Sequence, residues 1–141
     1  MKIKKMTGFA AAIMMCSAFM AGCTSKTSAA TKGNQAGDTI KIGVNMELSG
    51  AAGGYGQQEK NGIQLAVDEI NAKGGVNVNG KKKKIKAIYR DNKSSTSTSS
   101  SVATQLTTQD KVVATIGPAT TNDGTATIPT ANKTCVPFLS A

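Results

Sequence analysis

The 141-residue sequence contains no histidine and no tryptophan, and aromatic residues make up only 4% of it. Without histidine, the chain lacks the commonest general base and the commonest metal ligand. The G-x-S-x-G motif and any spacing typical of metal ligands are also missing. Neither G-x-G-x-x-G nor G-x-x-x-x-G-K-[ST] is present, so no nucleotide cofactor is indicated. These absences argue against an enzyme and predict neither a cofactor nor a metal site.

The first 22 residues have the features of an export signal. Lysines within residues 2–5 precede an apolar run from Phe9 to Ala21, which is shorter than the roughly 20 residues that span a membrane. The run leads into Met20-Ala21-Gly22-Cys23, which resembles a bacterial lipobox, although Met20 stands where leucine is usual. We expect cleavage before Cys23 and lipid attachment to this cysteine. The alternative is an ordinary secretory signal followed by a chance cysteine.

Residues 23–38 are predicted to be a flexible, lipid-anchored linker. The stretch from Thr24 to Gly37 is rich in Ser, Thr, Ala, Gly and Lys, a composition that cannot bury enough apolar surface to fold. Leaving out the three lysines of residues 1–22 lowers the formal net charge from +9 to +6. We therefore expect an exported, membrane-anchored protein on the extracytoplasmic face, in a periplasm or on the outer surface of a Gram-positive cell.

The three cysteines have separate predicted fates. Cys16 leaves with the export signal, and Cys23 carries the lipid. Cys135 is then alone in the exported domain, where a reactive thiol is one interpretation. We expect instead that Cys135 is a small apolar residue at the start of a buried strand.

Residues 39–141 alternate between the patterns of strands and helices. Apolar, β-branched runs predict strands at 39–46, 85–89, 112–116 and 135–140. Helical periodicity and stop signals predict helices over 56–73, about 102–110 and from the Thr121 or Asn122 N-cap to about 133. Pro129 lies inside the last helix and predicts a kink or a short helix. The order βαβαβαβ predicts an α/β fold with a parallel, doubly wound sheet.

Two segments between these elements have biased compositions. Val76 to Lys84 is predicted to be a turn that contains the basic run Lys81 to Lys84. Because this run has no interleaved aromatic or arginine residues and belongs to an exported chain, we interpret it as solvated turn and expect no nucleic-acid partner. Lys93 to Ser101 is predicted to be a Ser/Thr-rich connection.

Two loops follow strands that should end at the same edge of the sheet. The first loop, SGAAGGYG from Ser49 to Gly56, offers backbone N–H groups and the ring of Tyr55. The second, GPATTND from Gly117 to Asp123, offers two threonine hydroxyls and a helix start. Together they predict a site for a small ligand with a carboxylate or phosphate group. The alternative is that the glycines only turn the chain and that the threonine only caps its helix.

Carboxylates give little sign of acid–base chemistry, since the spacing forces no two of them together. Glu47 follows the first predicted strand and is the one carboxylate placed to face a cleft. We interpret it as a solvated group at the rim.

Three stretches together resemble the ABC-transporter substrate-binding proteins of the leucine/isoleucine/valine-binding family. They are IKIGVNMELSGAAGGYGQQEKNGIQLAVDEINAKGGV, IKAIYRDN and IGPATTNDGTATIPTANKTCVPFLSA. The resemblance covers residues 39–141 and implies most of the first lobe of a two-lobed, periplasmic-binding-protein-like type I fold, with the second lobe absent. It implies that Tyr55 borders the ligand, that Thr121 binds its α-carboxylate, and that Ser49, Ala119 and Thr120 support them.

The resemblance also implies a function and partners. The protein is expected to bind a branched-chain or other neutral amino acid and to deliver it to an ABC permease, which works with an ATPase subunit. Three alternatives remain open. The same fold could bind an amide, urea or aromatic acid, the chain could be an exported α/β enzyme for phosphate esters, or it could be a regulatory receptor domain.

Overall fold

The computed structural model describes residues 33–140. The predicted export signal, Cys23 and most of the predicted linker lie outside the described residues. Within residues 33–140, the search for long apolar helices finds none that could cross a membrane. The described end of the predicted linker contacts the domain, because the side-chain amide of Asn34 donates to the carbonyls of Thr107 (2.7 Å) and Val112 (2.8 Å).

A five-stranded sheet forms the centre of the fold, in the order β2-β3-β1-β4-β5. β1 pairs in parallel with both β3 and β4, and β4 pairs in parallel with β5. The predicted α/β class with a largely parallel sheet is therefore confirmed. β2, which pairs antiparallel with β3, was not predicted. The strands are β1 (Thr39–Met46), β2 (Val76–Val78), β3 (Lys81–Asp91), β4 (Ala114–Ile116) and β5 (Phe138–Leu139).

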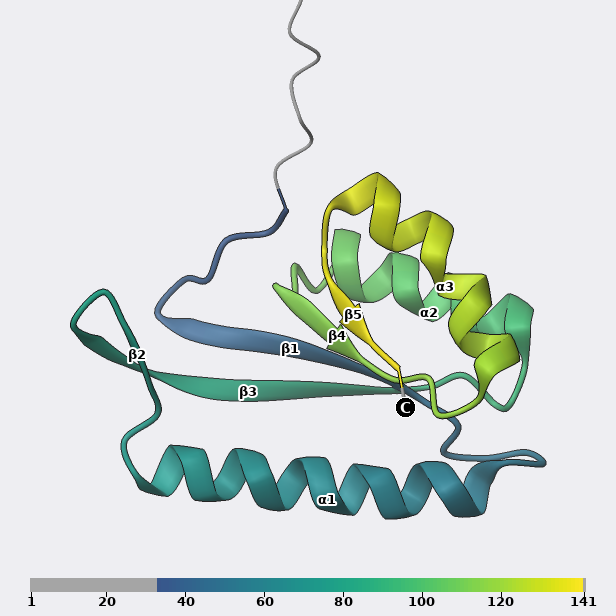
Figure 1. The fold of residues 1–141 in the computed structure, drawn as a ribbon, viewed down its shortest axis with the longest axis horizontal. Coiled ribbons are helices and arrows are strands. Elements are labelled where there is room, and N and C mark those ends of the chain that lie inside the picture. The colour runs from purple at the N-terminus through teal and green to yellow at the C-terminus, as the bar shows by residue number, and fades with distance from the viewer. Residues whose placement is uncertain (1–32, 141) are drawn as a thin grey trace, which may run out of the picture.

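Three helices cover the sheet from both sides, as Figure 1 shows. α1 (Gly53–Ala72) lies along one face, and α2 (Thr96–Thr108) and α3 (Thr121–Thr134) lie together on the other. Strand alternation decides which side chains meet which helix. Tyr89 of β3 faces α1, where its hydroxyl donates to Gln64 at 3.0 Å. Asn45 of β1 faces α2, where its side-chain amide donates to the carbonyl of Ser99 at 3.0 Å.

The hydrophobic core lies between the sheet and α2. Leu106 of α2 is fully buried and packs with Val102, Val112 and Val136, and Ile88 of β3 packs against this cluster. The close approach of α2 to the sheet depends on Gly43 of β1. A Cβ at this position would lie 3.0 Å from the Leu106 side chain, so the neighbouring atoms would have to move.

The basic run Lys81 to Lys84 is the first half of a long strand rather than a turn, which corrects the sequence prediction. The turn is only Asn79-Gly80, where both residues have positive φ angles of 52° and 80°, as a two-residue hairpin turn requires. The lysines also bind backbone carbonyls. Lys82 donates to Lys73 at 2.9 Å and Lys84 donates to Asn71, so both satisfy carbonyls at the end of α1.

Three further boundaries differ from the sequence prediction. α2 begins at Thr96, so most of the predicted Ser/Thr-rich connection is helical. α3 continues through Pro129 to Thr134 and is not shortened by it. Cys135 is exposed and adopts the left-handed conformation at the end of α3, so it is not the start of a buried strand. β5 begins only at Phe138.

Replacing Leu106 by alanine should lower the free energy of unfolding by about 2–5 kcal/mol, because it removes a fully buried side chain and leaves a cavity. Urea denaturation of the chain measures this change. Leu65→Ala is the matched control, since Leu65 is 61% exposed and its loss should change stability by less than about 1 kcal/mol. Equal losses for the two variants would contradict the placement of the core.

Candidate functional site

The carboxylate of Asp91, the last residue of β3, organises the first loop. Its Oδ2 accepts the Ser49 hydroxyl at 2.6 Å, and its Oδ1 accepts the N–H groups of Leu48 at 3.0 Å and Lys93 at 2.8 Å. Burial opposes ionisation, but these hydrogen bonds outweigh it and lower the pKa of Asp91. The Ser49 hydroxyl proton is therefore used within the protein.

A second set of hydrogen bonds holds the same loop to the segment after β3. The Ser94 hydroxyl donates to the carbonyl of Ser49 at 2.8 Å and accepts the N–H of Ala52 at 3.0 Å. Gly50 between them has a φ angle of +79°, and a Cβ there would lie 2.6 Å from the carbonyl oxygen of Lys93. The turn therefore requires glycine at this position.

Tyr55 stands out from the loop on the first turn of α1. Its side chain is 72% exposed. It lines a hollow of about 330 Å³ with Ala51, Gly54 and Gln58. The ring is thus available to a ligand, and nothing else in residues 33–140 covers it.

Glu47 is fully buried, which corrects its interpretation as a solvated rim group. Its carboxylate accepts the N–H of Ala119 at 2.9 Å, the N–H of Thr120 at 3.3 Å and the hydroxyl of Thr120 at 3.1 Å. Two of the backbone donors that the sequence offered to a ligand are therefore taken by an internal carboxylate. The contacts join the end of β1 to the start of α3.

The hydroxyl of Thr120 lies between two carboxyl groups. It is 3.1 Å from Glu47 Oε1 and 2.8 Å from Asp123 Oδ2, and Asp123 is only 4% exposed. The Thr120 hydroxyl is the donor in both contacts, so its one proton is shared between the two acceptors. Glu47 already accepts two backbone N–H groups, which favour its charged form. Glu47 is therefore the partner whose contacts favour ionisation, and its charge disfavours a second charge on Asp123.

The pKa values follow the same assignment. Burial alone would raise the pKa of Glu47, but hydrogen bonds from Ala119, Asp123 and Thr120 overcome this and lower it. Burial raises the pKa of Asp123, the hydrogen bond from Thr120 opposes the rise, and the nearby Glu47 adds to it. On α1, burial and the charge of Glu47 raise the pKa of Glu59.

Thr120 is the N-cap of α3, one residue before the position that the sequence indicated. Thr121 is therefore the first residue of the helix. Its side chain is exposed, and its hydroxyl and N–H make no hydrogen bond within residues 33–140. It lines a hollow of about 270 Å³. The other residues around that hollow are Gly124, Thr125, Ile128, Phe138 and Ser140.

Both loops lie at the carboxyl ends of parallel strands, as predicted. Glu47 comes directly before the first loop, and its side chain binds the second. The close approach of the second loop to β1 depends on Gly117, where φ is +83° and a Cβ would overlap the carbonyl oxygen of Asn45. The hollows at Tyr55 and at Thr121 have no lining residue in common. The two loops therefore form neighbouring parts of one edge rather than one closed pocket.

Sequence reasoning missed the three carboxyl groups that build the site, Glu47, Asp91 and Asp123. Two of them do carry a signal, since Glu47 and Asp91 stand where a strand ends and a loop begins. Within residues 33–140, no group of three or more His, Cys, Asp or Glu side chains could hold a metal ion.

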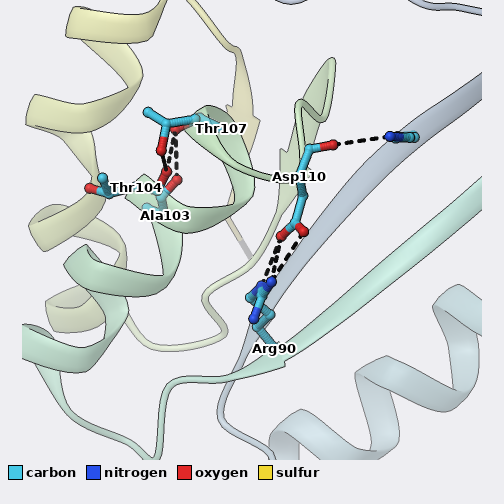
Figure 2. Close-up of polar contacts among 7 residues, drawn as sticks. Arg90, Ala103, Thr104, Thr107 and Asp110 are labelled. Carbon is cyan, nitrogen blue, oxygen red and sulfur yellow. Dashed lines mark hydrogen bonds and ion pairs between the residues drawn. The ribbon is translucent and has the colours of Figure 1, made fainter.

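The basic side chain of Arg90, near the end of β3, is already paired. Figure 2 shows the guanidinium of Arg90 in a two-pronged contact with the carboxylate of Asp110, with distances of 2.9 and 3.1 Å. This is the one ion pair among residues 33–140. Glu47 therefore has no Lys or Arg nitrogen of that range within 4.0 Å. Its charge is stabilised by N–H and O–H dipoles alone.

An open, largely parallel sheet with helices on both faces and two loops at one edge is the arrangement in which α/β proteins bind small ligands beyond the carboxyl ends of their strands. The family described as periplasmic binding protein matches residues 39–141, and the chain belongs to this family. The predicted resemblance is thereby confirmed.

Individual relatives agree with this membership. The chain is 57% identical over 37 residues to the Leu/Ile/Val-binding protein BraC3 of Rhizobium johnstonii, a stretch that covers 26% of this chain and 10% of that protein. It is similar to the branched-chain amino acid transporter substrate-binding protein LivJ of Streptococcus pneumoniae, solved in complex with isoleucine. That match has a TM-score of 0.67 and 50% identity over 72% of this chain and 28% of the other.

A third match is the solute-binding protein of an ABC transporter from Rhodopseudomonas palustris, solved in complex with 3,4-dihydroxybenzoic acid. It is 30% identical with a TM-score of 0.64, over 74% of this chain and 27% of the other. The chain thus spans about a quarter of the length of these solved proteins. The fold it shows is that of one lobe of the type I arrangement.

Replacing Asp123 by asparagine should flatten the pH dependence of stability. The folded-state pKa of Asp123 is raised above its ordinary value of 3.8. Its contribution is therefore complete below that value and is lost as pH rises through the raised pKa, by about 1.4 kcal/mol per unit of pKa difference. Asparagine does not titrate in this range, and the neighbouring carboxylate of Glu47 remains.

Urea denaturation of the chain from pH 4 to pH 8 measures the effect. The wild type should lose stability with rising pH relative to Asp123→Asn. Asp68→Asn, on the exposed face of α1, should keep the wild-type pH dependence. Parallel curves for the wild type and Asp123→Asn would mean that the pKa of Asp123 is not raised in the folded chain.

Proposed function

We propose that this chain supplies part of the first lobe of a two-lobed solute receptor of an ABC importer, and that the receptor binds a branched-chain or other neutral amino acid. The observation that carries the proposal is the exposed start of α3 at Thr121, in a chain that belongs to the periplasmic binding protein family. The 50% identity to a protein solved with isoleucine supports this class of ligand.

The proposed residues divide into two groups. Thr121 has a hydroxyl and an N–H without partners in residues 33–140, and a helix start favours a carboxylate. Tyr55 offers an exposed ring to the apolar part of the ligand. Ser49, Ala119 and Thr120 line the same edge, but their polar groups bind Asp91 and Glu47. They hold the wall in shape for the other two.

The organisation of the chain is part of the proposal. Residues 1–22 form the lipoprotein signal, residues 23–38 the tether, and residues 39–141 the ligand-binding lobe. The receptor stands on the extracytoplasmic face, anchored by lipid on Cys23, and contacts the permease of an importer that an ATPase subunit drives. It binds no nucleic acid and performs no turnover.

A second candidate ligand is another small solute, such as an aromatic acid, an amide or urea. The 30% identical protein solved with 3,4-dihydroxybenzoic acid favours it. A thermal-shift panel on the complete receptor that contains this sequence separates the two. Stabilisation by leucine, isoleucine or valine supports the first candidate. Stabilisation by aromatic acids, amides or urea alone favours the second.

Replacing Thr121 by valine in the complete receptor should weaken amino-acid binding by about 1–3 kcal/mol, because one hydrogen bond to a charged carboxylate is lost. Isothermal titration calorimetry measures the change. Thr108→Val is the control, since Thr108 is also exposed on a helix, and its hydroxyl donates to the carbonyl of Thr104, away from the proposed site. Unchanged affinity in Thr121→Val would show that the hydroxyl does not bind the ligand.

Replacing Cys23 by serine should move the protein from the membrane fraction to the soluble extracytoplasmic fraction of a bacterial host, because the lipid attachment site is gone. Cell fractionation with detection of the chain measures this. Cys16→Ser should stay with the membrane, since Cys16 belongs to the removed signal. A wild-type chain found only in the soluble fraction would contradict lipid anchoring.

A further inference from the structure

The buried carboxylate of Glu47 lies directly behind the proposed ligand contact. It accepts the N–H groups of Ala119 and Thr120, and Thr121 is the next residue along the chain. Consecutive Cα atoms are only about 3.8 Å apart. A ligand carboxylate bound at Thr121 would therefore lie within a few ångströms of another negative charge.

That charge has no cationic partner within the described part of the chain. Arg90, which shares its side of the sheet, is bound by Asp110. The other titratable groups packed around Glu47 are Asp123 from α3 and Glu59 from α1, and both are acids. From α2, the neighbouring side chain is the neutral Ser99, which binds the carbonyl of Asp123.

Of the two acids, Glu47 is the one that accepts two backbone N–H groups, which favour its charged form, while burial raises the pKa of Asp123. Burial strengthens the interaction of that charge with anything bound nearby, because little water is present to screen it. A ligand that carries only a carboxylate meets repulsion. A ligand that also carries an ammonium group gains an attraction that offsets the repulsion.

We propose that Glu47 is a charge-selectivity residue, whose buried carboxylate behind Thr121 makes the site favour zwitterionic amino acids over carboxylic acids without an ammonium group. The proposal rests on the proposed function, and it adds a reason within this lobe for the choice of ligand. Glu47 acts through its charge and through the loop that it holds.

A single neutral substitution would not test this cleanly. In Glu47→Gln, the new amide can donate to Asp123, which favours the charged form of Asp123. The negative charge would then lie on Asp123 instead of on residue 47. The informative comparison is between Asp123→Asn, which keeps the charge on Glu47, and the double variant Glu47→Gln with Asp123→Asn, which removes it.

The experiment measures binding of leucine and of its 2-oxo acid, which has the same carbon skeleton without the ammonium group. Calorimetry on the complete receptor gives both dissociation constants at pH 7. The ratio of the two affinities should favour leucine equally in the wild type and in Asp123→Asn. It should fall by about tenfold or more in the double variant. Glu69→Gln, on the exposed face of α1, should leave the ratio unchanged.

Each outcome has one meaning. An unchanged ratio in the double variant, with both affinities lowered alike, would overturn the proposal and leave Glu47 a support for the loop. If the double variant does not fold, Glu47→Met in the Asp123→Asn background carries the same comparison. A wild-type receptor that binds no amino acid would instead contradict the proposed function, and the proposal with it.

Discussion

The hydrogen bonds from Ala119 and Thr120 to the carboxylate of Glu47 are the constraint on which the site depends. They join Glu47, at the end of β1, to residues that lie 72 and 73 positions later in the chain. A buried carboxylate is stable only if its lone pairs are satisfied, and here backbone N–H groups satisfy them. Because each N–H has a fixed direction, the loop before α3 can take only a narrow range of conformations. The exposed position of Thr121 follows from that restriction.

The same device is used a second time at the neighbouring strand end. Asp91 gathers the N–H groups of Leu48, Ser49 and Lys93 as Glu47 gathers those of the second loop. Loops at the carboxyl ends of strands have unpaired N–H groups that no sheet or helix satisfies. An acidic residue at the strand end accepts several of them at once. The edge is therefore a set of loops fixed by internal carboxylates, with selected groups left exposed.

The parts of the fold that the sequence predicted are those with local causes. The bounds of β1 follow from the alternating β-branched residues within it. The same local pattern predicted the strand conformation of Ile85 to Tyr89 in β3. The lysines of β3 were misassigned because their strand conformation comes from pairing that the basic run itself does not display. Lys81 to Lys83 pair with β2 across the Asn79-Gly80 turn, and Lys84 pairs with Thr39, 45 residues earlier. The burial of Glu47 also depends on partners far along the chain. Cys135 was misplaced because it ends α3 in the left-handed conformation, and the next strand begins only at Phe138.

The candidate site also has features with local causes and features that depend on distant parts of the chain. Glycine-rich loops after apolar strands predicted its place at the sheet edge, and both loops do lie at that edge. Which threonine faces outward depends on a competition that the sequence does not display. Thr120 and Thr121 are chemically identical, and a shift of one residue in the helix start would exchange them. Glu47 decides between them, because it binds the backbone and hydroxyl of Thr120 and so commits that residue to the interior. Thr121 is then left at the first position of α3, beside a buried negative charge that a ligand carboxylate has to tolerate.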